Sequence, residues 1–370
     1  SPDELASNKL DGVLKATDRR YVWPHEKTDA MLSPNGRVME MLSEHTLQGW
    51  LQGYLLTGRH GLFPSYEAFL PIVDSMVSQY LKFIKASQDY SWRKPVSSLN
   101  YLLTSVCWRQ EHNGFSHQNP GFISTLLTKE REEKLVRLYF PADANMLLTV
   151  SEHALNSTNR INVIVSDKQL IKQWQTYEEA QKQAAVGASI WEFASHKEPD
   201  VVLTACGDYQ TQEGLAAIRL LRQILPQLNV RFVNISELNV IGVPAEFKNG
   251  LSEKTFLELF TRDKPVVFAF HGYPDTIKQL LFDRSSSHRF HIYGYSESGT
   301  TTTPFDMLVG NNVSRYDLAM ELVRQAAKNN ISIAKHVGAV MRFCEDKLVE
   351  HKEYIKIHGK DMDEVNTWKW

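Results

Sequence analysis

The densest group of side chains that could do polar chemistry lies between Trp108 and Gly121. This short stretch contains two histidines, two asparagines, two glutamines and an arginine. Such groups can transfer protons and can hydrogen-bond a sugar or a phosphate. A loop of this kind is more often idle surface, but it follows the apolar run 98–106, which we expect to be a buried strand. Because open α/β sheets bind ligands just beyond the ends of their strands, its position favours a binding loop.

Spacing excludes several chemistries at this loop and nearby. His112 and His117 do not predict a zinc site, because no third ligand follows at helical or hairpin spacing. Ser116 and His117 do not match a nucleophile elbow. The turn 58–61 is too short for a phosphate-binding P-loop and lacks its following Lys and Ser/Thr. Polar catalytic or sugar-binding groups therefore explain the loop better than a metal does.

Two further segments could carry chemistry. Glu44 is surrounded by core-like residues of an apolar helix, so we expect its carboxyl to be partly buried. A buried carboxyl can hold or exchange a proton near neutral pH, although most glutamates within helices are simply exposed. The tract 296–304 is rich in small hydroxyl residues and ends at a helix-starting Pro304. It could bind an anion or merely cap a helix, and we favour the capping loop.

The elements that must position these residues alternate regularly. Apolar spacing predicts helices over 36–56 and 70–86. It then predicts strands at 98–106, 136–140 and 161–165, separated by helices at 121–129, 144–155 and 169–185. After the polar segment 195–200 the rhythm restarts. The second series has strands at 201–205, 230–235, 266–270 and 290–293, and helices at 212–225, 253–260, 276–281, 317–328 and 334–352.

This alternation predicts the fold class. Strands that alternate with helices form parallel sheets covered by helices on both faces. We therefore expect an α/β protein with two three-layer α/β domains and mostly parallel sheets. The predicted domains are residues 1–194 and 201–370, joined by the linker 195–200.

Composition sets further bounds. The chain has 370 residues, 42% of them hydrophobic and 23% charged, with a net charge of −2, which is typical of a globular protein and indicates no nucleic-acid partner. No apolar run approaches the ~20 residues of a membrane span, and no signal peptide precedes Ser1. Cys107, Cys206 and Cys344 are far apart and resemble free thiols. We expect a cytoplasmic protein without membrane contact, cut from a longer chain because it opens without Met.

Four segments, taken together and in order, resemble the second half of a phosphoketolase. They are Ser43–His45, Leu55–Gly61, Gln110–Gln118 and Thr300–Asp306. Phosphoketolases are thiamine-diphosphate-dependent, transketolase-like enzymes, so the resemblance implies a pyrimidine-binding-type domain followed by a transketolase C-terminal-like domain. The family holds the cofactor diphosphate through Mg²⁺, using a Gly-Asp-Gly motif and a later Asn. Because Gly207-Asp208 is followed here by Tyr, we expect the N-terminal diphosphate-binding domain to be missing, and no metal ligands in this chain.

The resemblance implies roles for individual residues. Glu44 matches the glutamate that contacts N1′ of the cofactor aminopyrimidine, where a carboxyl favours the imino tautomer. Tyr66 matches the aromatic residue that stacks on the pyrimidine. Asn113 and His117 match groups that contact the sugar or the cofactor adducts. The positions around the sugar phosphate are matched by Ser7, Lys9, Gln110, His112 and Lys168. Lys9 replaces an Arg of some relatives, which exchanges a bidentate fork for a point charge.

The implied reaction belongs to carbohydrate metabolism. A lyase of this kind cleaves xylulose 5-phosphate, or fructose 6-phosphate, with inorganic phosphate to give acetyl phosphate and an aldose phosphate. We expect a homodimer, and we expect this fragment alone to be inactive. Two alternatives remain open. The chain could be half of a transketolase or an E1β-like half of a 2-oxo-acid dehydrogenase, or it could be an assembly domain without turnover.

Overall fold

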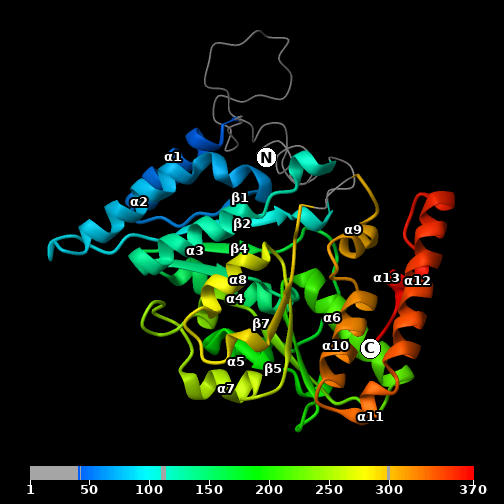
Figure 1. The fold of residues 1–370 in the computed structure, drawn as a ribbon. Coiled ribbons are helices and arrows are strands. Elements are labelled where there is room, and N and C mark those ends of the chain that lie inside the picture. The colour runs from blue at the N-terminus through cyan, green and yellow to red at the C-terminus, as the bar shows by residue number, and fades with distance from the viewer. Residues whose placement is uncertain (1–40, 42, 110–113, 298–300) are drawn as a thin grey trace, which may run out of the picture.

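The computed structural model describes residues 41, 43–109, 114–297 and 301–370. The described chain forms two sheets, each flanked by helices (Figure 1). Parallel pairing dominates both sheets, which confirms the predicted α/β class with mostly parallel strands.

The first sheet has four strands, all parallel, in the order β1-β2-β4-β3. Its strands are β1 (Phe63–Tyr66), β2 (Leu99–Ser105), β3 (Val136–Tyr139) and β4 (Ile161–Val165). Every residue of β4 is buried, as expected for an inner strand covered on both faces. The accompanying helices are α1 (Glu44–Leu56), the 3-10 helix η3 (Glu67–Val73), α2 (Asp74–Ser87), α3 (Gly121–Glu133), α4 (Ala144–Asn156) and α5 (Tyr177–Val186).

The second sheet has five strands in the order β5-β7-β6-β8-β9, and only β5 runs antiparallel. Its strands are β5 (Ala188–Ile190), β6 (Val201–Cys206), β7 (Val230–Ile235), β8 (Val266–Phe270) and β9 (Phe290–Tyr293). The helices of this half are α6 (Asp208–Ile224), α7 (Glu253–Phe260), α8 (Pro274–Leu281), α9 (Pro304–Gly310), α10 (Arg315–Ala327), α11 (Ile331–Ala334), α12 (Val337–His358) and α13 (Asp363–Thr367). Helix α10 packs against β6 and β8, with α6 and α12 beside it.

The predicted helix over 169–185 is wrong in its first half, because the helix begins only at Tyr177. The carboxylate of Asp143 caps α4 and also accepts the backbone N–H groups of Trp174 (3.0 Å) and Gln175 (2.8 Å). These bonds hold the chain in a non-helical path until Thr176 and Glu179 form a capping box.

The short strands β1 and β5 were absent from the prediction. Strand β5 lies within the predicted first domain but pairs with β7 of the second sheet. Strand pairing therefore favours a domain boundary earlier than residue 194, and the boundaries predicted from sequence remain a proposal.

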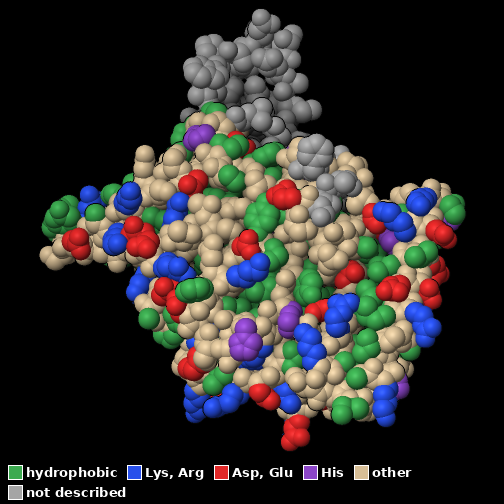
Figure 2. Space-filling model, viewed as in Figure 1, with side chains coloured by type: hydrophobic (Ala, Val, Ile, Leu, Met, Phe, Trp, Pro, Cys, Tyr) green, Lys and Arg blue, Asp and Glu red, His purple; other side chains and the backbone are tan. Residues whose placement is uncertain are grey.

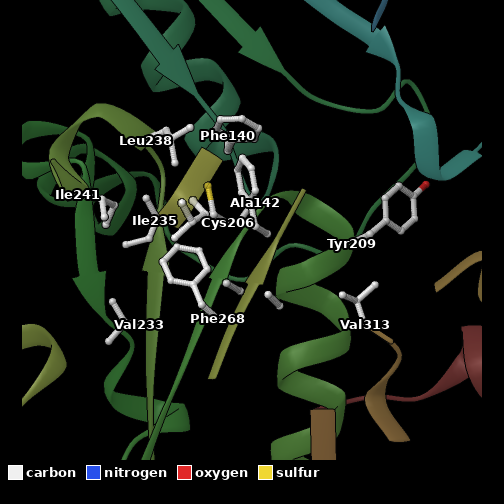
Figure 3. Packing of buried hydrophobic residues seen from close by; sticks show 14 of the residues in the cluster. Phe140, Ala142, Cys206, Tyr209, Val233, Ile235, Leu238, Ile241, Phe268 and Val313 are labelled. Atoms are coloured by element: carbon white, nitrogen blue, oxygen red, sulfur yellow. The ribbon is translucent and has the colours of Figure 1, made fainter. Parts of the chain in front are cut away.

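The two halves share one hydrophobic core. Phe140, just after β3, packs its ring 5.7 Å from that of Phe270 at the end of β8. Figure 3 shows Phe140 and Ala142 beside Cys206 and Phe268 of the second sheet. The seam also contains an ion pair, in which Arg137 Nη1 lies 2.6 Å from Glu237 Oε1. Groups at the facing edges of the two sheets are therefore held in a fixed relation.

The face of the molecule shown in Figure 2 has no dominant charge sign. Figure 2 shows acidic and basic side chains interspersed over one side of the molecule, in keeping with the net charge of −2. Across the described residues, no helix combines the length and the apolar character needed to span a membrane.

Candidate active site

The candidate site lies at the carboxyl edge of the first sheet. Tyr66 is the last residue of β1, the turn 107–109 follows β2, and Lys168 comes shortly after β4. Because these three strands are parallel and adjacent, their carboxyl ends meet at one edge. Residues that are far apart in the sequence therefore converge on one region.

Tyr66, His117 and Lys168 form a cluster at this edge. The ring of His117 stands edge-on to Tyr66, with centroids 5.6 Å apart, and to Phe69 at 5.1 Å. Lys168 Nζ lies 5.2 Å from the centre of the Tyr66 ring and 3.1 Å from Ser105 Oγ. All three residues of the cluster are half-buried. The structure thus brings together three of the residues predicted for the site.

Burial lowers the pKa of Lys168. The ammonium group nevertheless lies against the face of the Tyr66 ring, an arrangement that favours a cation. His117 Nδ1 lies 2.9 Å from Ser116 Oγ, which fixes the orientation of the imidazole. The cluster therefore offers an aromatic face, a cation and an oriented imidazole at one place.

Glu44 enters the region as the first residue of α1. The residue is half-buried, and Ser43 caps the helix by accepting the N–H of Thr46 at 3.3 Å. Helix α1 packs against β1, β2 and η3, and one turn further the buried Gln48 accepts a 2.6 Å hydrogen bond from Tyr101. Within the described part of the chain, no hydrogen bond or ring contact joins Glu44 to the cluster.

The remaining predicted residues lie outside the described residues. They are Ser7, Lys9, Gln110, His112 and Asn113. Their roles stay predictions.

The described end of the hydroxyl tract, residues 301–304, caps a helix. Thr303 Oγ1 accepts the N–H of Asp306 to cap α9, and Thr302 Oγ1 donates to the Asp306 carboxylate at 2.5 Å. Residues 301–304 also line a cavity of about 750 Å³, together with Arg109 and the end of α12. A Cβ added at Gly114 would lie 2.6 Å from Thr301 Oγ1, so this tract touches the segment that leads to His117.

A set of acidic and aromatic groups beneath Lys168 was not predicted. The Asp167 carboxylate accepts hydrogen bonds from the Tyr209 hydroxyl and from the backbone of Lys168 (2.7 Å). The backbone N–H of Asp167 in turn donates to Asp208 Oδ2 at 3.0 Å. Burial, and after it the Asp208 carboxylate, raise the pKa of Asp167 to about 6. Figure 3 shows the Tyr209 hydroxyl turned away from the apolar cluster.

A second unpredicted group is the fully buried pair of Glu67 and His271. His271 Nε2 lies 2.9 Å from Glu67 Oε1 and 3.1 Å from Oε2. Each residue directly follows a strand, β1 or β8, and a charged residue at the end of an apolar strand was the signal that could have found both.

Glu67, Cys107 and His271 also offer ligand atoms within 4.8 Å of one another, a spacing that could hold a metal ion. However, Nε2 of His271 is already engaged by both carboxylate oxygens. Burial, and after it the Glu67 carboxylate, raise the pKa of the Cys107 thiol well above its usual value, so the group is a neutral thiol in this structure. The geometry therefore describes a hydrogen-bonded pair beside a thiol.

Comparison with known proteins identifies the family that the chain resembles. Residues 1–157 match the family described as D-xylulose 5-phosphate/D-fructose 6-phosphate phosphoketolase, and residues 168–370 match the C-terminal domain of that family. The chain is 49% identical over 373 residues to a probable phosphoketolase of Bradyrhizobium diazoefficiens, and 50% identical over 372 residues to one of Brucella suis. Each match covers 100% of this chain and 46% of the relative, so the chain spans about half the length of these curated relatives.

Solved structures show the same fold. A transketolase from Pichia stipitis aligns with 80% of this chain and 39% of its own, at a TM-score of 0.59 and 15% identity. A chain titled split gene transketolase, inactive β4 tetramer, aligns over 80% of this chain and 84% of its own, at a TM-score of 0.54 and 13% identity. The low identities show a shared transketolase-like fold and no more. Through the family matches that cover nearly all its residues, the chain belongs to the D-xylulose 5-phosphate/D-fructose 6-phosphate phosphoketolase family.

Proposed function

We propose that this chain forms the cofactor-pyrimidine and sugar-phosphate side of a thiamine-diphosphate-dependent phosphoketolase. The observation that carries the proposal is the cluster of Tyr66, His117 and Lys168 at the carboxyl edge of a parallel sheet. Three residues that the family resemblance assigns to one site are thus in contact in the fold. The reaction would be cleavage of xylulose 5-phosphate or fructose 6-phosphate with inorganic phosphate, giving acetyl phosphate and an aldose phosphate.

The chain's own residues suit the aminopyrimidine of the cofactor. Tyr66 offers a half-buried ring for stacking, and Glu44 offers a half-buried carboxyl at the start of a helix. Thiamine diphosphate held by these residues would supply the carbanion chemistry needed for C–C cleavage. Glu44 would hold a proton at N1′ of the pyrimidine and so fix its tautomer. His117 and Asn113 would orient the sugar and exchange protons with its oxygens.

Lys168 carries the substrate-phosphate part of the proposal. Its ammonium is half-buried and held between Tyr66 and Ser105, so it would meet an anion with little reorganisation. The other groups proposed around the phosphate are Ser7, Lys9, Gln110 and His112. A cation at this point would select phosphorylated over free sugars.

We further propose that a diphosphate-binding domain outside this chain supplies the Mg²⁺ site, and that the enzyme works as a cytoplasmic homodimer. Two comparisons support the first point: the curated relatives are about twice as long, and the split-gene transketolase chain of similar extent is titled inactive. The three cysteines are buried and unpaired, which suits a reducing compartment. The isolated chain would then show no turnover.

The identity of the reaction product tests the proposed function. The intact protein that contains this chain, supplied with thiamine diphosphate and Mg²⁺, should form acetyl phosphate from xylulose 5-phosphate and inorganic phosphate. Transfer of the two-carbon unit to an aldose acceptor, without any need for phosphate, would instead indicate a transketolase. No turnover with either acceptor would favour an assembly role.

A further inference from the structure

The buried pair of Glu67 and His271 joins the two halves of the molecule. Glu67 opens η3 directly after β1, whereas His271 follows β8 of the second sheet. Both side chains have 0% exposure, and 204 positions separate them in the sequence. Their 2.9 Å contact is therefore a tertiary link between the carboxyl edges of the two sheets.

Each end of this link is attached to the candidate site. Glu67 is the neighbour of Tyr66, so its position sets where β1 ends. Glu67 Oε2 also accepts the N–H of Cys107 at 3.1 Å, where the chain leaves β2 for the polar loop. On the other side, the backbone carbonyl of His271 accepts the indole N–H of the buried Trp108 at 2.9 Å. The pair thus fixes the Tyr66 backbone and the start of the loop to one point.

The segment that carries Lys168 is also connected to His271, through Asp208. Gly207 has φ 123°, and a Cβ there would lie 3.0 Å from the Cβ of His271, so the end of β6 passes close to the imidazole. Asp208 then accepts the N–H of Asp167, next to Lys168. Burial lowers the pKa of His271, but the carboxylates of Glu67, Asp208 and Asp167 raise it overall, which favours an imidazolium among these acids.

We propose that Glu67 and His271 are positioning residues, which hold Tyr66 in register with the turn 107–109 and with Lys168. The proposal rests on the proposed function, because it assigns these three segments to one cofactor and substrate site. Neither residue touches the site surface, since both are fully buried. Their effect would be on how well the cofactor ring and the substrate fit between the segments.

Glu237 and Arg137 provide a matched control. Their ion pair also joins the two halves, with Nη1 and Oε1 2.6 Å apart, and the Glu237 side chain is 6% exposed. Arg137 lies in β3 and Glu237 follows β7, and among the described residues no hydrogen bond or ion pair joins their side chains to Tyr66, Cys107 or Lys168. Glu237→Gln should therefore cost stability by the same mechanism as Glu67→Gln without moving the site.

The experiment compares Glu67→Gln, His271→Gln and Glu237→Gln in the intact protein with thiamine diphosphate and Mg²⁺. We expect either change in the proposed pair to raise the half-saturating cofactor concentration and the KM for xylulose 5-phosphate by about tenfold or more. Glu237→Gln should leave both within about twofold, although its melting temperature falls by a similar amount. The double variant Glu67→Gln/His271→Gln should show less than additive losses, since both changes break one link.

The possible results distinguish a positioning role from a general loss of stability. Equal cofactor and KM shifts in Glu67→Gln and Glu237→Gln, at equal loss of melting temperature, would overturn the positioning role. If Glu67→Gln does not fold, His271→Gln decides the same question. A parent protein that forms no acetyl phosphate would defeat the proposed function instead, and cofactor binding, followed by tryptophan fluorescence, would still test the pair.

Discussion

The carboxyl edges of the two sheets meet in one region but contribute different kinds of residue. The first sheet presents half-buried groups, Tyr66 and Lys168, that a ligand could reach. The second sheet ends there in buried groups, with His271 at 0% exposure and Asp208 at 4%. In the proposed function, the first edge would supply the groups that meet a ligand, whereas the second edge, together with the buried Glu67 of the first, would hold them in place.

The largest expected effect is a loss of activity on changing Glu44, which is proposed to act beside the first edge. Glu44→Gln should reduce acetyl phosphate formation by about 100-fold or more, because the amide cannot hold and exchange the proton at the pyrimidine. The half-exposed side chain has little packing to lose, so the melting temperature should stay close to that of the parent protein. Activity retained in this variant would remove Glu44 from its proposed role.

An effect on stability, and not on activity, is expected where the two edges touch, at Asp167. Its pKa in the folded protein, about 6, lies above the ordinary value of 3.8 because of burial. The folded state therefore binds this proton more tightly than the unfolded state, and stability falls as pH rises from about 4 to about 6. Asp167→Asn should remove up to about 3 kcal/mol of that pH dependence, measured by urea unfolding across the range. Parallel curves for the two proteins would contradict the assignment.

The smallest effect should come from the supporting edge. Tyr209→Phe deletes the hydroxyl that donates to the Asp167 carboxylate. Loss of one hydrogen bond to a charged group should cost about 1.5 kcal/mol in the free energy of unfolding at pH 7.5. Activity should fall far less than in Glu44→Gln, because Tyr209 reaches the site indirectly, through Asp167 and Arg109. A loss of activity as large as that of Glu44→Gln would contradict the supporting role of the second edge.

Much of the fold was predictable because parallel strands buried on both faces are short apolar runs. Such runs predicted β2, β4, β6, β7 and β8 within a residue or two. The strands β1 and β5, of four and three residues, are too short to show a pattern. The helix over 169–185 was overextended because its first half bonds to Asp143, which is distant in sequence.

The residues of the site also fall into those that the sequence predicted and those that it did not. Tyr66 and Lys168 were predicted only through the resemblance of whole motifs, since neither has a telling local pattern. Glu67 and His271 were missed, because a pair separated by 204 positions leaves no periodic trace in one sequence. The position of each at the end of an apolar strand could have marked the two residues singly, but the sequence does not show that they pair.

The carboxylate of Asp143 has a consequence for the motions of the chain. It accepts the N–H groups of Met146, Trp174 and Gln175 at once, so it ties the first turn of α4 to the segment that leads from Lys168 towards the second sheet. These amides cannot be freed separately without leaving a buried carboxylate short of donors. They should exchange with solvent deuterium as one cooperative unit, at a common opening free energy. The hydrogen bonds that fix the segment between the two halves would then break and re-form together.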